Sequence, residues 1–195
     1  MIRFGFSLKR VLLMLVVLAI VVPTYAPLGA AELKGVKMAD SIEVDGQKLV
    51  LNGLALRKKV IFKVYVAGLY LTQKEKNAGK ILAADTARQA VMHFLRDVPK
   101  GKITDAWLEG LQENTPKASP ELKKQFQTLC AAMEDMKEEQ RLVFTYIPGK
   151  GTKIEVNGKN KGVLEGKAFS DALTACWIGP NPGPGESFKE DILGL

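Results

Sequence analysis

A β-favouring stretch over residues 49–71 (LVLNGLALRKKVIFKVYVAGLYL) constrains the fold of this chain more than any other feature. β-branched and aromatic side chains dominate its second half, and such side chains fit a pleated, half-buried surface. The dipeptide Asn52-Gly53 lies between apolar residues, where two residues that tolerate positive φ favour a tight hairpin turn. The pattern therefore predicts strands at residues 47–51 and 54–58, joined at Asn52-Gly53, and a long strand over residues 60–71.

The first 31 residues have the pattern of a secretory signal peptide. Three basic residues precede a twelve-residue apolar run at 11–22, and the small residues 29–31 suit cleavage before Glu32. The run is too short and wrongly flanked for a membrane-spanning helix, although an uncleaved anchor is the alternative. We expect an N-terminal signal peptide at 1–31, a periplasmic protein with no stable membrane insertion after cleavage, and one domain over 32–195.

Composition excludes several classes of function. Loss of the leader removes three basic and no acidic residues, so the net charge falls from +7 to +4. The remaining charges of both signs are interspersed, as on a solvated surface, and no nucleic-acid partner is expected. The single histidine, His93, lies in an apolar run and is predicted to be structural or solvent-facing. Without metal-ligand spacings or a serine elbow, the chain predicts no metal site, no cofactor and no hydrolase triad.

The two cysteines fall on apolar stripes of two predicted helices. Cys130 and Cys176 are therefore expected to be unbridged core thiols, because free cysteine behaves as a small buried hydrophobe. The alternative is a disulfide, since an oxidising compartment closes any pair of thiols that meet.

The order of elements predicts an α+β domain. Strands are expected at residues 41–44, 47–51, 54–58, 60–71, 88–98, 141–147, 152–156 and 162–164. Helices are expected at 74–85, from a cap at Thr104 to Asn114, from Ser119 onward, at 167–177, and near the C-terminus. Strands, two helices, strands and a helix indicate helices segregated to one face of an antiparallel sheet.

Several short motifs carry a resemblance to a known family. They are Leu51-Asn52-Gly53, Leu56-Arg57, residues 63–71 (KVYVAGLYL), 94–98 (FLRDV), Ala106-Trp107, 109–111, Asn114, 177–180 (WIGP) and 192–194 (ILG). Together, over residues 35–195, they resemble the chalcone isomerase-like family in its bacterial exported branch. The resemblance implies an open-faced β-sandwich with helices packed on one face of a large antiparallel sheet.

The resemblance also implies five site positions. The enzymes of the family close a chalcone to a flavanone with an Arg, a Thr, a Tyr, an Asn and a second Thr or Ser. These positions fall on Arg57, Tyr65, Pro99, Ala106 and Cys176. Only the arginine is retained, which disfavours isomerase activity, and no catalytic residue is predicted. Fatty-acid-binding members of the fold keep the arginine with a tyrosine near it, and Arg57 and Tyr65 resemble that pair.

A guanidinium fork and a phenol suit a carboxylate, which can accept hydrogen bonds from both. We therefore predict a non-catalytic protein that binds an apolar carboxylate, such as a fatty acid, through Arg57 and Tyr65. Eight residues of straight strand span roughly 26 Å, so the pair meets only if the chain bends between them.

Three alternatives to this prediction stay open. Arg57 could pair with a structural acid such as Asp97 or Glu165, with Tyr65 in the core. The protein could be an intramolecular lyase acting on a chalcone-like enone, with Arg57 stabilising an oxyanion. It could also be an interaction module without a small ligand, and the sequence identifies no protein partner.

Overall fold

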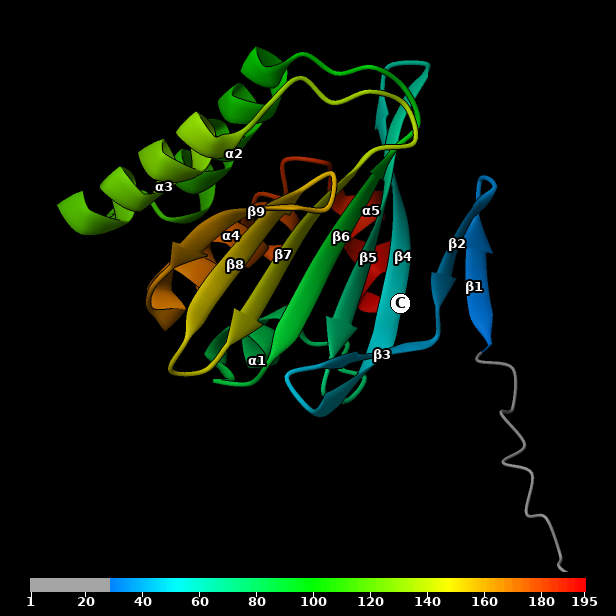
Figure 1. The fold of residues 1–195 in the computed structure, drawn as a ribbon, viewed down its shortest axis with the longest axis horizontal. Helices are drawn as coiled ribbons and strands as arrows, with labels where there is room; N and C mark the ends of the chain where they lie inside the picture. The colour runs from blue at the N-terminus through cyan, green and yellow to red at the C-terminus, as the bar shows by residue number, and fades with distance from the viewer. Residues whose placement is uncertain (1–28) are drawn as a thin grey trace, which may run out of the picture.

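The computed structural model describes residues 29–195, which form a large sheet with helices on one side (Figure 1). The predicted leader therefore lies outside the described residues, apart from residues 29–31. The sheet has seven antiparallel strands in chain order: β3 (Ser41–Val44), β4 (Gln47–Lys59), β5 (Phe62–Leu71), β6 (Arg88–Phe94), β7 (Arg141–Ile147), β8 (Gly151–Val156) and β9 (Lys159–Leu164). A separate two-stranded ribbon is formed by β1 (Ala30–Leu33) and β2 (Val36–Ala39).

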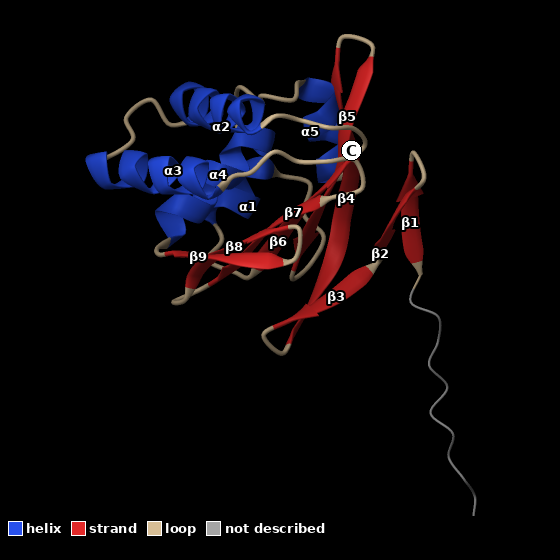
Figure 2. Cartoon of the chain, turned by 45° about the horizontal axis from the view of Figure 1, so that its top comes forward, coloured by secondary structure: helices blue, strands red, loops and turns tan. Residues whose placement is uncertain are grey.

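All five helices lie on the same side of the sheet (Figure 2). They are α1 (Ala78–Ala83), α2 (Lys100–Asn114), α3 (Pro120–Ala132), α4 (Lys167–Ile178) and α5 (Glu186–Leu193). The main core fills the space between sheet and helices, where Phe126 and Phe169 pack edge to face 5.4 Å apart. This arrangement confirms the predicted α+β fold, an open-faced sandwich. Within residues 29–195, no helix has the length and apolar character to cross a membrane.

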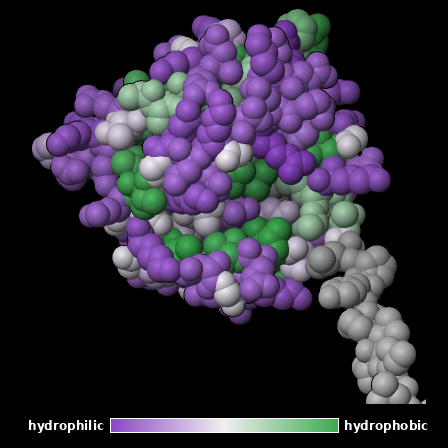
Figure 3. Space-filling view, viewed as in Figure 1, coloured by the Kyte–Doolittle hydropathy of each residue, from purple (hydrophilic) through white to green (hydrophobic). Residues whose placement is uncertain are grey.

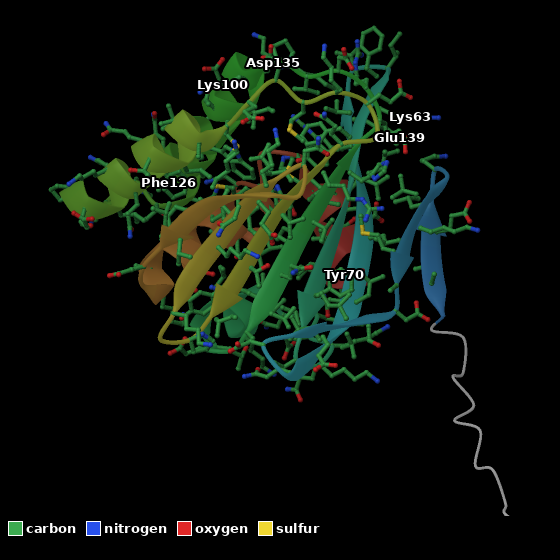
Figure 4. All side chains as sticks on the ribbon, viewed as in Figure 1. Lys63, Tyr70, Lys100, Phe126, Asp135 and Glu139 are labelled. Atoms are coloured by element: carbon green, nitrogen blue, oxygen red, sulfur yellow. The ribbon has the colours of Figure 1, made fainter. Side chains whose placement is uncertain are left out.

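The β1–β2 ribbon covers part of the opposite face of the sheet. Val36 and Met38 pack with apolar side chains of β4 and β5 in a second, smaller core. The Tyr70 hydroxyl donates a 2.9 Å hydrogen bond to the carbonyl oxygen of Ala39, and Figure 4 shows Tyr70 near this end of the sheet. Gly68 leaves room for the ribbon, because a Cβ there would lie 2.5 Å from the Met38 sulfur.

The prediction of a hairpin turn at Asn52-Gly53 is wrong. β4 runs through this dipeptide as one strand, with a bulge between Leu51 and Gly53. The chain reverses instead at Val60 and Ile61, where Lys59 pairs with Phe62. Asn157-Gly158, by contrast, forms a tight turn, with φ of 47° and 75° and with Val156 paired to Lys159.

Helix boundaries follow the predicted signals unevenly. Ser119 caps α3 as predicted, because its side chain accepts a hydrogen bond from the Leu122 amide. The predicted cap at Thr104 is wrong: α2 begins one turn earlier, at Lys100, and Thr104 donates to the carbonyl oxygen of Gly101. The helix begins there because the Asp135 carboxylate accepts from the Lys100 amide at 2.8 Å, a contact from a distant loop (Figure 4).

Candidate ligand-binding cleft

A cleft of about 1010 Å³ opens between the sheet, α2 and the Gly/Pro-rich loop that follows α4 (residues 179–185). The elements that surround it gather at the end of the molecule where the β4–β5 hairpin projects (Figure 2). Its volume lies at the upper end of the roughly 300–1,000 Å³ typical of small-molecule sites. The cleft is thus large enough for a ligand with a long apolar portion.

Arg57 and Tyr65 both line this cleft, and they are direct partners across the β4–β5 hairpin. The reversal at Val60 and Ile61 supplies the bend that this meeting requires, directly after Lys58-Lys59, where the sequence suggested it. A bulge between Arg57 and Lys58 leaves Val64 without a partner in the register and places Tyr65 opposite Arg57. The hairpin therefore brings together the two residues that the resemblance singled out.

Arg57 has no acidic partner within residues 29–195. Its Nη1 donates a 2.8 Å hydrogen bond to the carbonyl oxygen of Pro184 in the Gly/Pro-rich loop. Asp97 instead pairs with Lys137, and its oxygen lies 2.8 Å from the Lys137 Nζ. Glu165 is not among the residues that line the cleft, and its backbone carbonyl accepts from Gln125. The alternative in which Asp97 or Glu165 neutralises Arg57 is therefore wrong. A guanidinium carries five N–H donors, so the single bond to the Pro184 carbonyl leaves most of the Arg57 donors available to a ligand.

Tyr65 is buried among aromatic rings. Its ring centroid lies 5.8 Å from that of Phe94 and 6.1 Å from that of Phe188. Burial raises the pKa of Tyr65 well above its ordinary value, and the Arg57 charge and the neighbouring Trp177 indole oppose this only in part. The phenol is therefore neutral at physiological pH and retains a proton to donate.

Apolar side chains form the inner walls of the cleft and charged ones its rim. The inner walls include Val64, Met92, Phe94, Ile103, Trp107 and Trp177. The charged residues, besides Arg57, are Lys59, Arg96, Asp97, Lys102, Asp105, Glu109, Glu113 and Glu186. An apolar interior with a few polar anchors is typical of small-molecule sites.

The five positions assigned by resemblance all line this one cleft: Arg57, Tyr65, Pro99, Ala106 and Cys176. Pro99 caps α2 without a side-chain hydrogen bond. The Cys176 thiol packs on Gly110, and burial raises its pKa to about 12. Proline, alanine and a buried thiol offer no hydroxyl or amide group to orient a reacting enone. The fold thus brings the five positions together, but three of them lack a hydroxyl or amide group that can donate a hydrogen bond to a reacting enone.

Two features of the site were not predicted. Trp177 is buried in the core and also forms part of the cleft wall. The carbonyl oxygen of Pro184 was not foreseen as the partner of Arg57. A Pro/Gly-rich segment that cannot continue a helix was the available signal, because its carbonyl groups lack helical partners.

The other expected residues have structural positions. His93 is buried on the opposite face of the sheet, where its Nδ1 accepts from the Arg141 Nε at 3.2 Å. Cys130 and Cys176 are free thiols, as predicted, although Cys130 is only partly buried. Residues 29–195 contain no group of three or more His, Cys, Asp or Glu side chains placed to hold a metal ion.

The sheet, its single helical face and the cleft define a chalcone isomerase-like α+β fold. A family model described as chalcone isomerase-like matches residues 30–194, and the chain belongs to that family. A crystal structure of a fatty-acid-binding protein from Arabidopsis thaliana is similar, with a TM-score of 0.65 and 14% identity, over 85% of this chain and 96% of that one. A comparison with curated proteins found no match.

Proposed function

We propose that this protein binds a fatty acid or a similar apolar carboxylate in the cleft without transforming it. The observation that carries the proposal is the pairing of Arg57 with Tyr65 on the cleft wall, with no carboxylate of residues 29–195 bound to the arginine. Arg57 is only partly buried, but its charge has no acidic partner among the described residues, so an anionic ligand is the natural one.

The chemistry of the two side chains fits a carboxylate. Arg57 supplies a fixed charge and a planar fork, with its position maintained by the bond to the Pro184 carbonyl oxygen. Tyr65 is kept protonated by burial and can donate to a ligand oxygen. The apolar chain of the ligand would then lie against Met92, Phe94 and Trp177. The similar plant structure is that of a fatty-acid-binding protein, which supports this ligand class.

Ligand identification and calorimetry test the proposal. Native mass spectrometry of protein purified from cells, followed by lipid extraction, should detect a bound carboxylic acid. Titration of the delipidated protein with medium- and long-chain fatty acids should show saturable binding. Absence of both a co-purifying acid and calorimetric binding would contradict the proposal.

Site variants locate the binding. Arg57→Gln removes a charge-assisted interaction of about 1.5–3 kcal/mol in total, which corresponds to a loss of about 10- to 150-fold in affinity. Tyr65→Phe removes a single neutral donor and should weaken binding by about 2- to 10-fold. Arg141→Gln and Tyr70→Phe are matched controls, because both residues lie on the opposite face of the sheet. Equal losses in site and control variants would show that the effects are not local.

Isomerisation of a chalcone-like enone is the second candidate, and the retained Arg57 is what favours it. Three of the other positions, Pro99, Ala106 and Cys176, provide no equivalent donors. A spectrophotometric assay of chalcone bleaching tests this directly. Turnover that disappears in Arg57→Gln would replace the binding proposal by an intramolecular lyase.

Export to the periplasm, in the bacterial exported branch of the family, is part of the same proposal. Its support is the leader pattern of residues 1–31. Cleavage before Glu32 would leave the Glu32–Lys37 and Leu33–Val36 pairs of the β1–β2 ribbon. The intact mass of protein from a periplasmic extract should match a chain that starts at Glu32. A mass that matches a chain starting at Met1, or recovery of the protein in the membrane pellet, would contradict cleavage.

A further inference from the structure

The β4–β5 hairpin ends in an apolar tip, formed by Val60, Ile61 and Phe62, that projects beyond the sheet (Figure 1). These side chains are 88%, 82% and 53% exposed. In Figure 3 the hairpin end is a small hydrophobic patch above a largely hydrophilic surface. Single exposed apolar residues are ordinary, but three consecutive ones on a projection indicate an interaction surface.

The turn itself is strained. Val60 has a φ of 56°, a conformation that is rare for β-branched residues. Two-residue hairpin turns prefer Asn, Asp and Gly, which adopt positive φ without this strain. A turn shaped by folding alone would not place Val and Ile here. Strain combined with apolar exposure therefore supports a functional role for the tip.

Basic residues surround the tip. Lys58, Lys59 and Lys63 are exposed on the two strands below it, and residues 47–74 contain no Asp or Glu. The Arg96 guanidinium lies 4.5 Å from the centre of the Phe62 ring. Glu139 lies at the same end as Lys63 (Figure 4), but its carboxylate is 3.2 Å from the His93 Nε2. An apolar point ringed by positive charge is complementary to an anionic surface with an apolar interior.

We propose that this tip docks on anionic lipid bilayers. Val60 and Ile61 would enter the boundary between headgroups and acyl chains, and the lysines and Arg96 would meet the lipid phosphates. A convex tip of three residues is small beside the roughly 800 Å² per partner that a stable protein interface buries. Two copies of the tip would bring like charges together. A bilayer satisfies both the charge and the shape.

Docking would place the cleft next to the bilayer. Lys59 and Phe62 belong both to the hairpin end and to the cleft lining. An apolar acid dissolved in the bilayer would then be close to Arg57 without crossing much water. This consequence rests on the proposed function, whereas docking itself requires no ligand.

Vesicle flotation tests docking with the processed full-length protein and no added fatty acid. We expect binding to vesicles of equal parts phosphatidylcholine and phosphatidylglycerol, and much weaker binding to phosphatidylcholine alone. Val60→Asn/Ile61→Ser should abolish binding, and Asn tolerates the positive φ of the turn. Lys58→Gln/Lys63→Gln should weaken binding by about fivefold for each charge removed. Val163→Ser is the control, because Val163 is another exposed apolar residue but lies on β9, away from the tip.

Each remaining outcome is decisive. Wild-type protein that does not float with the mixed vesicles, or a tip variant that floats as wild type does, would overturn the proposal. Self-association lost in Val60→Asn/Ile61→Ser would assign the tip to a second copy, and capture of one purified protein partner would assign it to that protein. Circular dichroism and urea unfolding confirm that the tip variant is folded. Calorimetry of the same variant with a fatty acid measures ligand binding in the cleft separately from docking. Lost flotation with unchanged fatty-acid binding shows that only docking has failed.

Discussion

The side-chain amide of Asn52 donates a 3.1 Å hydrogen bond to the carbonyl oxygen of Ile192, 140 residues further along the chain. The amide oxygen of Asn52 accepts from the Glu75 backbone amide at 2.8 Å. Both contacts are possible because the chain bulges at this point of β4. The bulge therefore serves as the docking point of α5 on the sheet, and α5 contributes Phe188 to the surroundings of Tyr65.

Gly53 makes this docking possible, and its replacement by alanine should destabilise the fold. A Cβ at Gly53 would lie 2.3 Å from the Asp191 carbonyl oxygen and 2.7 Å from that of Ile192. Backbone atoms cannot move aside as a side chain can, so overpacking should cost about 1–3 kcal/mol in the free energy of unfolding. Urea denaturation measures the loss.

Gly101→Ala is the matched control for this substitution. Gly101 lies in the first turn of α2, and a Cβ at this position would meet no other atom within 4 Å. Alanine there should be neutral or stabilising by up to about 1 kcal/mol. Equal destabilisation by the two substitutions would mean that the close approach of α5 is not what Gly53 provides.

Local signals predicted most strands and several helix ends, because the deciding contacts are near in sequence. Asn157-Gly158 forms a tight turn since only its own φ values and the flanking pairs matter. The identical dipeptide at Asn52-Gly53 does not, because β4 stays paired with β5 on both sides of it and α5 contacts both of its residues. The start of α2 likewise depends on Asp135, which is distant in sequence. The errors fall where a distant segment decides the local conformation.

The candidate site was predictable in its residues but not in its geometry. Arg57 and Tyr65 were identified by resemblance, and both line the cleft. Their meeting depends on a reversal at Val60 and Ile61, two residues that carry no turn signal. The Gly/Pro-rich segment indicated carbonyl groups without helical partners, but it did not indicate that the Pro184 carbonyl would meet Arg57, which is 127 residues away in the chain.

Arg88 holds α4 against the sheet, and its loss should be strongly destabilising. The buried guanidinium donates to the Ser170 hydroxyl at 3.0 and 2.8 Å, to the Ile81 carbonyl oxygen at 3.1 Å, and to Asp171. Arg88→Met removes the partner of the Ser170 hydroxyl and of the Ile81 carbonyl oxygen and leaves Asp171 paired with Lys167 alone, so it should lower the free energy of unfolding by about 3 kcal/mol. Lys137→Met breaks an exposed pair with Asp97 and should have a far smaller effect, because solvent screens such pairs. Comparable losses in urea denaturation would contradict the structural role of Arg88.

Tyr65 should make the fold sensitive to alkaline pH. Burial raises its pKa in the folded protein above the ordinary value of 10.0. In the unfolded chain the phenol loses its proton near this ordinary value, whereas the folded protein retains it. Stability from this group is therefore fully present below about pH 10 and falls as the pH rises toward the folded pKa.

The difference between wild type and Tyr65→Phe isolates this effect from other tyrosines, such as Tyr146, whose pKa is also raised, to about 12. Thermal unfolding between about pH 8 and pH 11 should show a steeper loss of stability in the wild type. Parallel pH profiles would mean that Tyr65 ionises as freely in the folded protein as in the unfolded chain. The same result would weaken its assignment as a neutral donor in the cleft.

The two thiols should be present but slow to react in the native protein. Burial raises the pKa of Cys176 to about 12 and also raises that of Cys130. Because the thiolate is the reactive form, native protein should react slowly with a thiol reagent at neutral pH. Cys130, being only partly buried, should react first. Denatured, unreduced protein should titrate two thiols, and a count of zero would show that a disulfide joins them in the exported protein.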